Sequence, residues 1–116
     1  MFKFNGFTPK ANAAINCAIE EASALGHTYI GSEHLLLGLL LEGSGVAFTV
    51  LQKAGVTVEK VREMLIKTVG RGIQSVLNPS DITPRCKRIL ELSLMQTRMS
   101  GIPLAGTEHI LVNLLK

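Results

Sequence analysis

The sequence predicts an all-α protein made of a tandem duplicated four-helix repeat, of which the second copy stops after its second helix. A shift of 75 residues, which moves Thr8 onto Thr83, aligns two segments of the chain without a gap. Apolar residues make up 47% of the sequence but aromatic residues only 4%, which favours helices packed through aliphatic side chains. The apolar residues recur at the spacing of an α-helix, and the length suits a single domain over residues 1–116.

The first repeat is expected over residues 8–70. Thr8 and Pro9 form an N-cap and first-turn pair, and the apolar residues that follow predict a first helix over about 9–25, which Gly26 ends. Three further helices are expected over about 33–41, 45–55 and 58–69. Their expected N-cap residues are Ser32, Ser44 and Thr57.

Residues 71–82 are rich in turn formers and are expected to link the repeats. The second repeat is expected over residues 83–116, with Thr83 and Thr107 capping the counterparts of the first two helices. Because counterparts of the third and fourth helices are missing, these two helices must bury their apolar faces against the first repeat, against another chain, or against residues that follow Lys116 in the natural protein. If nothing follows, we expect an exposed apolar patch that favours a dimer or a swapped arrangement through the second repeat.

Composition and charge limit the functional class. The formal charge of +3 is spread along the chain, and few aromatic residues could stack on bases, so nucleic acid is not an expected partner. A basic helical nucleic-acid-binding module remains the alternative, supported by the helix pairs and a pI near 9.1. Cys17 and Cys86 are expected to be small buried residues in a reducing compartment. The absence of a signal peptide or spanning stretch predicts a cytoplasmic location without membrane attachment.

Cations occupy the first turns of the two helices that threonines open. A helix N-terminus carries about half a positive charge and prefers acidic neighbours, so basic helix starts indicate a site for an anion. Backbone N–H groups, the threonine hydroxyl and a cation would hold that anion. The candidate residues are Thr8, Pro9, Lys10, Thr83, Pro84 and Arg85. The alternative is that both threonines are simple caps beside solvated cations.

Glu33 and Glu108 lie just inside the starts of the second helix of each copy, where the helix dipole stabilises a carboxylate. One interpretation is capping alone. The other is that each carboxylate lies close to the Thr-Pro helix start of its own copy and accepts a guanidinium group there. A ligand in which phosphate is joined to guanidinium would match both halves of such a site.

No catalytic motif is recognisable. His34 and His109 each follow a glutamate but lack the second histidine of HExxH, so both are expected to be hydrogen-bonded structural residues at helix starts. His27 is expected in a surface loop. Nothing matches a GxxxxGK[ST] phosphate loop or a GxSxG nucleophile motif. We therefore expect a protein that is not an enzyme and that uses neither a cofactor nor a metal.

One continuous run, GHTYIGSEHLLLGLL over residues 26–40 followed by EGSGVA over 42–47, closely resembles the N-terminal domain of the Clp-family AAA+ unfoldases, especially of the ClpC type. The resemblance covers nearly the whole chain and implies two tandem four-helix repeats. It also implies a domain that recruits adaptor and substrate proteins to an ATP-driven unfoldase, which feeds the ClpP protease. Since this chain lacks the ATPase modules, the resemblance implies a non-catalytic recognition domain that serves them and the protease indirectly.

For ClpC-type domains the resemblance also implies recognition of phosphorylated arginine as a degradation mark. Carried over by position, the binding pairs are Thr8 with Glu33 and Thr83 with Glu108. Ser32 replaces the threonine that is commoner in the family. Residues 101–105, Gly-Ile-Pro-Leu-Ala, depart from the family's polar and aromatic loop, so the site of the second copy is expected to bind more weakly.

Overall fold

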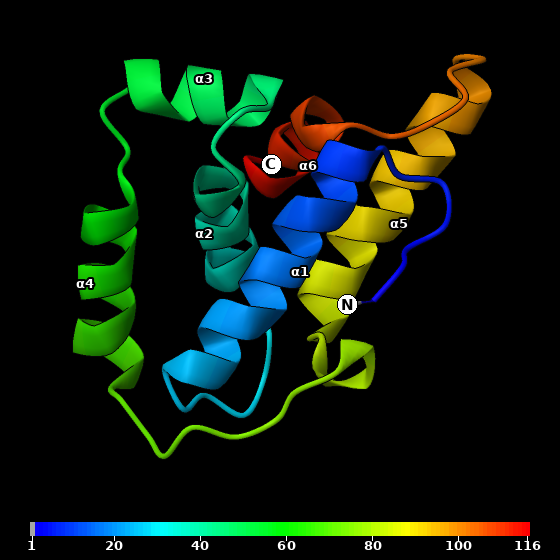
Figure 1. Cartoon of the computed structure of the whole chain (residues 1–116). Coiled ribbons are helices and arrows are strands. Elements are labelled where there is room, and N and C mark those ends of the chain that lie inside the picture. Colours follow the sequence, from blue (N-terminus) through cyan, green and yellow to red (C-terminus); the bar gives the residue numbers. More distant parts are fainter. Residues whose placement is uncertain (1) are drawn as a thin grey trace.

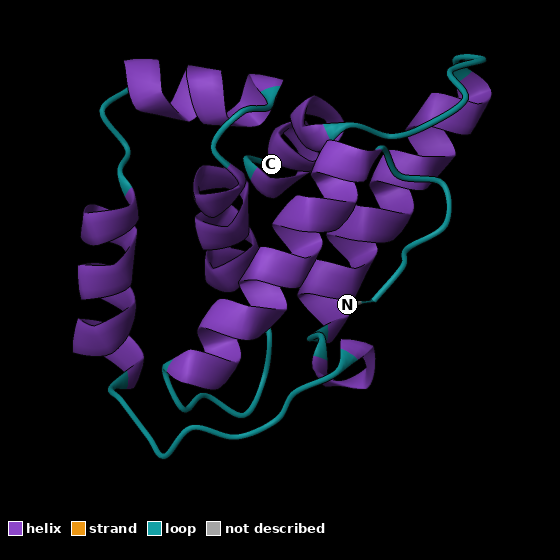
Figure 2. Cartoon of the chain, viewed as in Figure 1, coloured by secondary structure: helices purple, strands orange, loops and turns teal. Residues whose placement is uncertain are grey.

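The computed structural model describes residues 2–116, which form six α-helices and one short 3-10 turn (Figure 1). The elements are α1 (Pro9–Ala24), α2 (Ser32–Glu42), α3 (Val46–Lys53), α4 (Val58–Val69), η1 (Pro79–Asp81), α5 (Pro84–Met99) and α6 (Thr107–Leu114). The described residues contain no strand, only two isolated β-bridges, and Figure 2 shows helices joined by loops. The predicted all-α class is confirmed.

Helices α1 and α5 begin at equivalent positions of the two copies, and each is 16 residues long. Their threonine caps are confirmed. Oγ1 of Thr8 accepts a hydrogen bond from the amide of Ala11 at 3.1 Å, and Oγ1 of Thr83 accepts one from the amide of Cys86 at 3.2 Å. The repeated Thr-Pro pair therefore starts the same kind of helix in both copies.

Three other predicted caps are wrong by one residue. The N-caps of α2, α3 and α6 are Gly31, Gly45 and Gly106, in place of Ser32, Ser44 and Thr107. At α2 the amide of Gly31 donates to Nδ1 of His34 at 3.0 Å, and at α6 the amide of Gly106 donates to Nδ1 of His109 at 2.9 Å. An imidazole at the third helical position takes the role that Glu or Gln has in a capping box, so no hydroxyl is needed at the cap itself.

Helices α1 and α2 make close backbone contact at Gly38. A Cβ atom added to Gly38 would lie 2.9 Å from the amide nitrogen of Ala18 and would overlap the carbonyl oxygen of Ala14. All three residues are buried. The small residues on both helices therefore allow the tight contact that holds the first helix pair together.

Helices α5 and α6 use a polar contact at the equivalent place. Asn113 of α6 takes the position of Gly38, and its Nδ2 donates to Oγ of Ser93 at 3.1 Å and to Oε1 of Gln96 at 3.0 Å. The same group donates to the carbonyl oxygen of His109 at 3.0 Å. The second helix pair is thus held by a buried hydrogen-bond network instead of a glycine contact.

Two β-bridges join the repeats. The 75-residue shift relates each partner of one bridge to a partner of the other bridge. The bridges pair Phe7 with Ala105 and Ile30 with Ile82. The amide of Thr8 donates to the carbonyl oxygen of Ala105 at 2.9 Å, and the amide of Thr83 donates to that of Ile30 at 3.0 Å. The start of α1 in the first repeat therefore lies beside the loop before α6 in the second, and the start of α5 lies beside the loop before α2. A pseudo-two-fold relation between the helix pairs requires this reciprocity.

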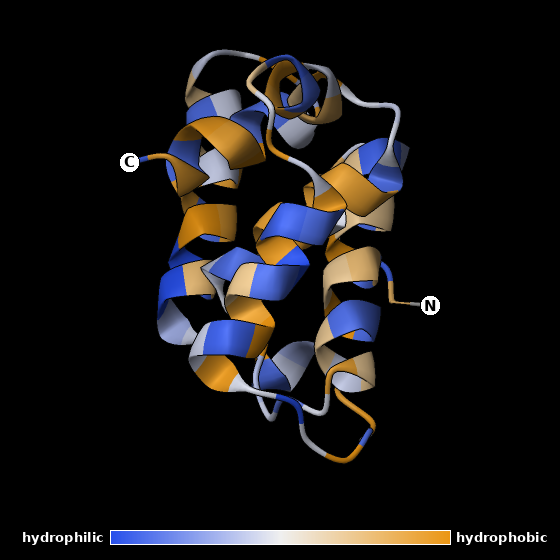
Figure 3. Ribbon diagram, turned by 90° about the vertical axis from the view of Figure 1, so that its left-hand side faces the viewer, coloured by the Kyte–Doolittle hydropathy of each residue, from blue (hydrophilic) through white to orange (hydrophobic). Residues whose placement is uncertain are grey.

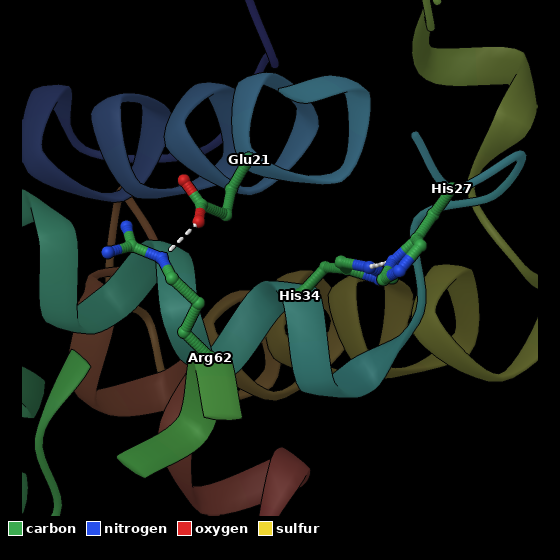
Figure 4. Close-up of polar contacts among 4 residues, drawn as sticks. All are labelled: Glu21, His27, His34 and Arg62. Carbon is green, nitrogen blue, oxygen red and sulfur yellow. Dashed lines mark hydrogen bonds and ion pairs between the residues drawn. The ribbon is translucent and has the colours of Figure 1, made fainter. Parts of the chain in front are cut away.

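Helices α3 and α4 lie on the outside of the first repeat (Figure 1). Val61 and Leu65 of α4 are buried and most other α4 residues are exposed, and hydrophobic and hydrophilic residues alternate along α4 in Figure 3. Nε of Arg62 lies 2.6 Å from Oε1 of Glu21, which joins α4 to α1 (Figure 4).

Helix α6 contacts α1, α2 and α3 as well as α5, so the second repeat buries apolar surface on the first.

Cys86 is buried, as predicted, whereas Cys17 is only partly buried. Residues 70–78, between α4 and η1, have no regular structure. Among residues 2–116 no single helix is long and apolar enough to cross a bilayer; α2 and α3 reach that threshold only as a pair, bent by 99°.

Candidate functional site

The crossed bridges bring Thr8 and Glu108 into one groove, which we call site A. The groove is open to solvent and has a volume of about 600 Å³. It is lined by the starts of α1, α3 and α6 (residues 8–10, 44–46 and 106–109), by Thr49, and by Ile102 and Leu104 of the loop before α6. Site A therefore contains residues from both repeats.

Backbone donors gather at site A. The amides of Lys10, Thr107 and Glu108 have no hydrogen-bond acceptor among residues 2–116. Two helix N-termini, each with a partial positive charge, thus border the same groove. The Thr8 hydroxyl accepts the Ala11 amide and keeps its own hydrogen to donate to a ligand. Lys10 adds positive charge at the edge, with Nζ 3.4 Å from the carbonyl oxygen of Ser44.

The Glu108 carboxylate supplies negative charge beside these donors. Glu108 is exposed and folds back toward the backbone of Gly106, where an added Cβ would lie 3.0 Å from Cδ of Glu108. It makes no ion pair among the described residues. An unpaired carboxylate of this kind can accept the planar fork of a guanidinium group. Site A therefore combines donors for an oxyanion with an acceptor for a guanidinium.

The start of α3 forms a wall of site A that sequence reasoning missed. The amide of Ala47 donates to Oγ1 of Thr107 at 3.3 Å, and a Cβ atom added to Gly45 would lie 2.5 Å from the same oxygen. The Glu42 carboxylate accepts the amides of Ser44 and Gly45 at 3.1 and 2.7 Å. Burial acts to raise the pKa of Glu42, but these hydrogen bonds and a nearby lysine outweigh burial and lower it. These acceptors use the amides of Ser44, Gly45 and Ala47, whereas the Val46 amide has no hydrogen-bond acceptor among residues 2–116 and adds a free donor to the groove.

The start of α5 at Thr83 and the start of α2, which carries Glu33, lie side by side, and we call this region site B. The bond from the Thr83 amide to the carbonyl oxygen of Ile30 places the start of α5 beside the start of α2. Burial, and then the negative charge of Glu33, raise the pKa of the Cys86 thiol to about 12. Oγ of Ser32 donates to Oε1 of Glu33 at 2.8 Å. The remaining candidates at this site, Pro84 and Arg85, are exposed.

The predicted pairing of the site residues is therefore wrong. Thr8 lines one groove with Glu108, and the start of α5 at Thr83 lies beside the start of α2 that carries Glu33, whereas the expected pairs were Thr8 with Glu33 and Thr83 with Glu108. The physical reason is the crossed pairing of loops between the repeats. Residues 101–105, on which the expectation of a weaker second site rests, lead into the groove that also contains Thr8, so this loop belongs to a site shared by both copies.

His27 is buried, with 4% of its surface exposed, so its expected place in a surface loop is wrong. Its Nδ1 lies 2.7 Å from Nε2 of His34 (Figure 4). Its Nε2 lies 2.7 Å from the carbonyl oxygen of Gly70. His34 is fully buried, and its pKa is lowered to about 4 by burial and then by the charge of His27. The predicted structural role of His34 and His109 at helix starts is confirmed.

Four other grooves along residues 2–116 lack this combination of groups. One of similar volume, about 600 Å³, runs along α5 from Arg88 to Met99. It contains neither of the capping threonines and neither Glu33 nor Glu108. Chemistry, rather than size, therefore distinguishes site A.

The duplicated helix pairs and the crossed bridges define a two-repeat all-α domain. Residues 6–116 match the family model described as the Clp repeat (R) N-terminal domain, and the chain belongs to this family. It is 45% identical over 113 residues to the "ATP-dependent Clp protease ATP-binding subunit ClpA homolog" of Guillardia theta. It is 44% identical over 113 residues to "Chaperone protein ClpC1, chloroplastic" of Arabidopsis thaliana.

These matches cover 97% of this chain but only 14% and 12% of the two relatives, so the chain corresponds to a small part of each. Among solved structures, the N-terminal domain of the chaperone ClpD from Arabidopsis thaliana is similar, with a TM-score of 0.75 and 26% identity. That match covers 97% of this chain and 77% of the ClpD domain chain. A structure from a study of a malarial protein secretion system shares the fold, with a TM-score of 0.71 at 22% identity.

Proposed function

We propose that the chain is a non-catalytic recognition domain that binds adaptor and substrate proteins for a Clp AAA+ unfoldase working with a ClpP-type protease. Family membership supports the domain type, and the ClpA and ClpC relatives support the parent machine. The exposed sites A and B support a binding role. The proposal involves no cofactor, metal, nucleic acid or membrane.

The ligand proposed for sites A and B is phosphoarginine. One observation carries this proposal. At site A, unpaired amides at two helix starts and the unpaired carboxylate of Glu108 line the same groove. The amides and the Thr8 hydroxyl would hold the phosphate, and Glu108 would hold the guanidinium. The guanidinium of unmodified arginine would be repelled by the positive helix ends. The phosphate of phosphoserine would be repelled by the Glu108 carboxylate, and phosphoserine has no guanidinium to pair with that carboxylate. Only a ligand with both groups satisfies both halves of the site.

Calorimetry with free phosphoarginine tests the proposal on the parent chain, Glu33→Ala, Glu108→Ala and the double variant. Each single substitution should weaken one site about tenfold or more, because a hydrogen bond to a charged group contributes about 1.5 to 3 kcal/mol. Both variants should stay folded, since a carboxylate at a helix start contributes only about 0.3 to 1 kcal/mol. Arginine and phosphoserine serve as control ligands. No binding to the parent, or equal binding to all four chains, would overturn the phosphoarginine assignment.

We also propose self-association through α6. Val112 and Leu115 are 53% and 69% exposed, whereas their counterparts in α2, Leu37 and Leu40, are 0% and 3% exposed under the outer helices. A second copy of the chain would cover this α6 surface and form a dimer. A cytoplasmic location is part of the same proposal, supported by two free cysteines, which are typical of a reducing compartment.

A further inference from the structure

The two sites differ in the hydrogen bonds that their histidines make. His34, near site B, and His109, at site A, occupy equivalent positions, and Nδ1 of each accepts the amide of the preceding N-cap glycine. A neutral imidazole whose Nδ1 accepts carries its hydrogen on Nε2. In both copies Nε2 is therefore the donor. The two histidines differ in the acceptor that lies near this donor.

At His34 that donor is already used. Nε2 of His34 donates to Nδ1 of His27, and Nε2 of His27 donates in turn to the carbonyl oxygen of Gly70, both at 2.7 Å. His34 has no exposed surface and His27 is 4% exposed. This chain of hydrogen bonds leaves His34 no donor for a ligand.

At His109 the donor has no partner. The position equivalent to His27 is Ile102, whose aliphatic side chain cannot accept a hydrogen bond. Nε2 of His109 has no hydrogen-bond partner among residues 2–116, and no buried side-chain nitrogen or oxygen in that range lacks one, so this atom reaches solvent. His109 and Ile102 both line site A, together with Thr8 and Glu108.

We propose that His109 is a ligand-binding residue of site A, where its Nε2–H donates to a phosphoryl oxygen of a phosphorylated guanidinium ligand. Site B has no equivalent contact, so site A should be the tighter of the two. The inference rests on the function proposed for these sites and adds a residue and an order of affinity to it. Lys10 and Glu108 are the charged groups that line site A with His109, and Glu42 lies beside the adjoining start of α3.

Calorimetry tests this in a Glu33→Ala background, where site A alone should bind phosphoarginine. His109→Phe removes the donor and should weaken site A about tenfold or more, the effect of one hydrogen bond to a charged group. His109→Gln keeps an acceptor for the Gly106 amide, as Gln does in a capping box, and offers an amide donor, so it should retain most of the affinity. In a Glu108→Ala background, His109→Phe should leave binding at site B unchanged.

The parent chain provides a readout that does not depend on variants. In a titration with phosphoarginine followed by ¹⁵N NMR of the imidazoles, the Nε2 resonance of His109 should shift and that of His34 should not. Binding at site A with His109 unmoved, or equal affinities of His109→Phe and His109→Gln, would overturn the role of His109 while leaving the phosphoarginine assignment intact. No binding to the parent chain would overturn both.

Discussion

The amide of Thr8 donates a hydrogen bond to the carbonyl oxygen of Ala105 at 2.9 Å. This bond ties the first helix of one repeat to the loop that leads into Glu108 in the other. The equivalent bond from Thr83 to Ile30 does the same for Glu33. Each candidate site is thus shared between repeats, so neither half of the duplication could form a complete site alone.

The crossed pairing predicts which double variants keep a site. Thr8→Val with Glu108→Ala removes two parts of site A, so one phosphoarginine site should remain. Thr8→Val with Glu33→Ala damages both sites, so binding should be lost. Calorimetric stoichiometry distinguishes the two combinations. The opposite result would mean that each threonine acts with the glutamate of its own repeat. Loss of a threonine cap costs about 1 kcal/mol, so circular dichroism should accompany each measurement.

Gly38→Ala should destabilise the fold even though alanine favours helices. In an isolated helix the change would stabilise by about 1 kcal/mol. Here the added Cβ would overlap the backbone of α1 at Ala14 and Ala18, and such overpacking costs about 1–3 kcal/mol. Urea denaturation measures the change in unfolding free energy. A higher free energy of unfolding in the variant would show that α1 and α2 move apart enough to accommodate the added Cβ.

The equivalent position of the second repeat provides a comparison. Asn113→Ala removes a buried donor to Ser93 and Gln96, which should cost about 1–3 kcal/mol because the partner groups lose their hydrogen bonds. Gly38→Ala and Asn113→Ala thus place alanine at equivalent positions of the two repeats. Both should destabilise the fold, the first through overpacking and the second through lost hydrogen bonds. A second substitution, Asn113→Ala with Ser93→Ala, should recover part of the loss, whereas no substitution of polar groups should rescue Gly38→Ala.

The buried His34 should make the fold sensitive to acid. Its pKa is lowered to about 4 in the folded chain from 6.5, by burial first and then by His27, against the opposing charges of Glu33 and Glu21. The unfolded chain therefore binds the proton first. The His34 contribution is fully present above about pH 6.5 and is lost as pH falls toward about 4, with a limiting slope of about 1.4 kcal/mol per pH unit.

His34→Gln isolates this contribution, since Gln can still accept the amide of Gly31 but does not titrate in this range. Its unfolding free energy should fall less steeply than that of the parent chain between about pH 6.5 and pH 4. Parallel pH profiles from urea denaturation would show that His34 is not the acid-sensitive group.

The α6 surface predicts concentration-dependent association. Replacing Val112 and Leu115 by lysine should abolish a dimer seen by sedimentation, because two charges would have to be buried in the interface. Replacing Ile73 and Val76, which are 92% and 93% exposed in the segment between α4 and η1, should leave it unchanged. A parent chain that stays monomeric at high concentration would contradict the dimer.

The sequence by itself determined the helices, their duplication and the residue types of the sites. Helical spacing and Thr-Pro starts are local signals, and they act through hydrogen bonds and packing within a few residues. The starts of α1 and α5 were therefore predicted correctly from Thr8 and Thr83. The glycine caps of α2 and α6 were missed because a histidine three residues along supplies the acceptor, a pattern that Glu or Gln more often provides.

Only the tertiary structure decided which residues meet. The contact of Thr8 with the loop before Glu108, and that of Thr107 with the start of α3, span long stretches of chain and depend on how the two helix pairs cross. The burial of His27 likewise depends on Gly70, which belongs to a different segment. No local pattern encodes such pairings, because the free energy that selects them comes from burying the apolar faces of both repeats together.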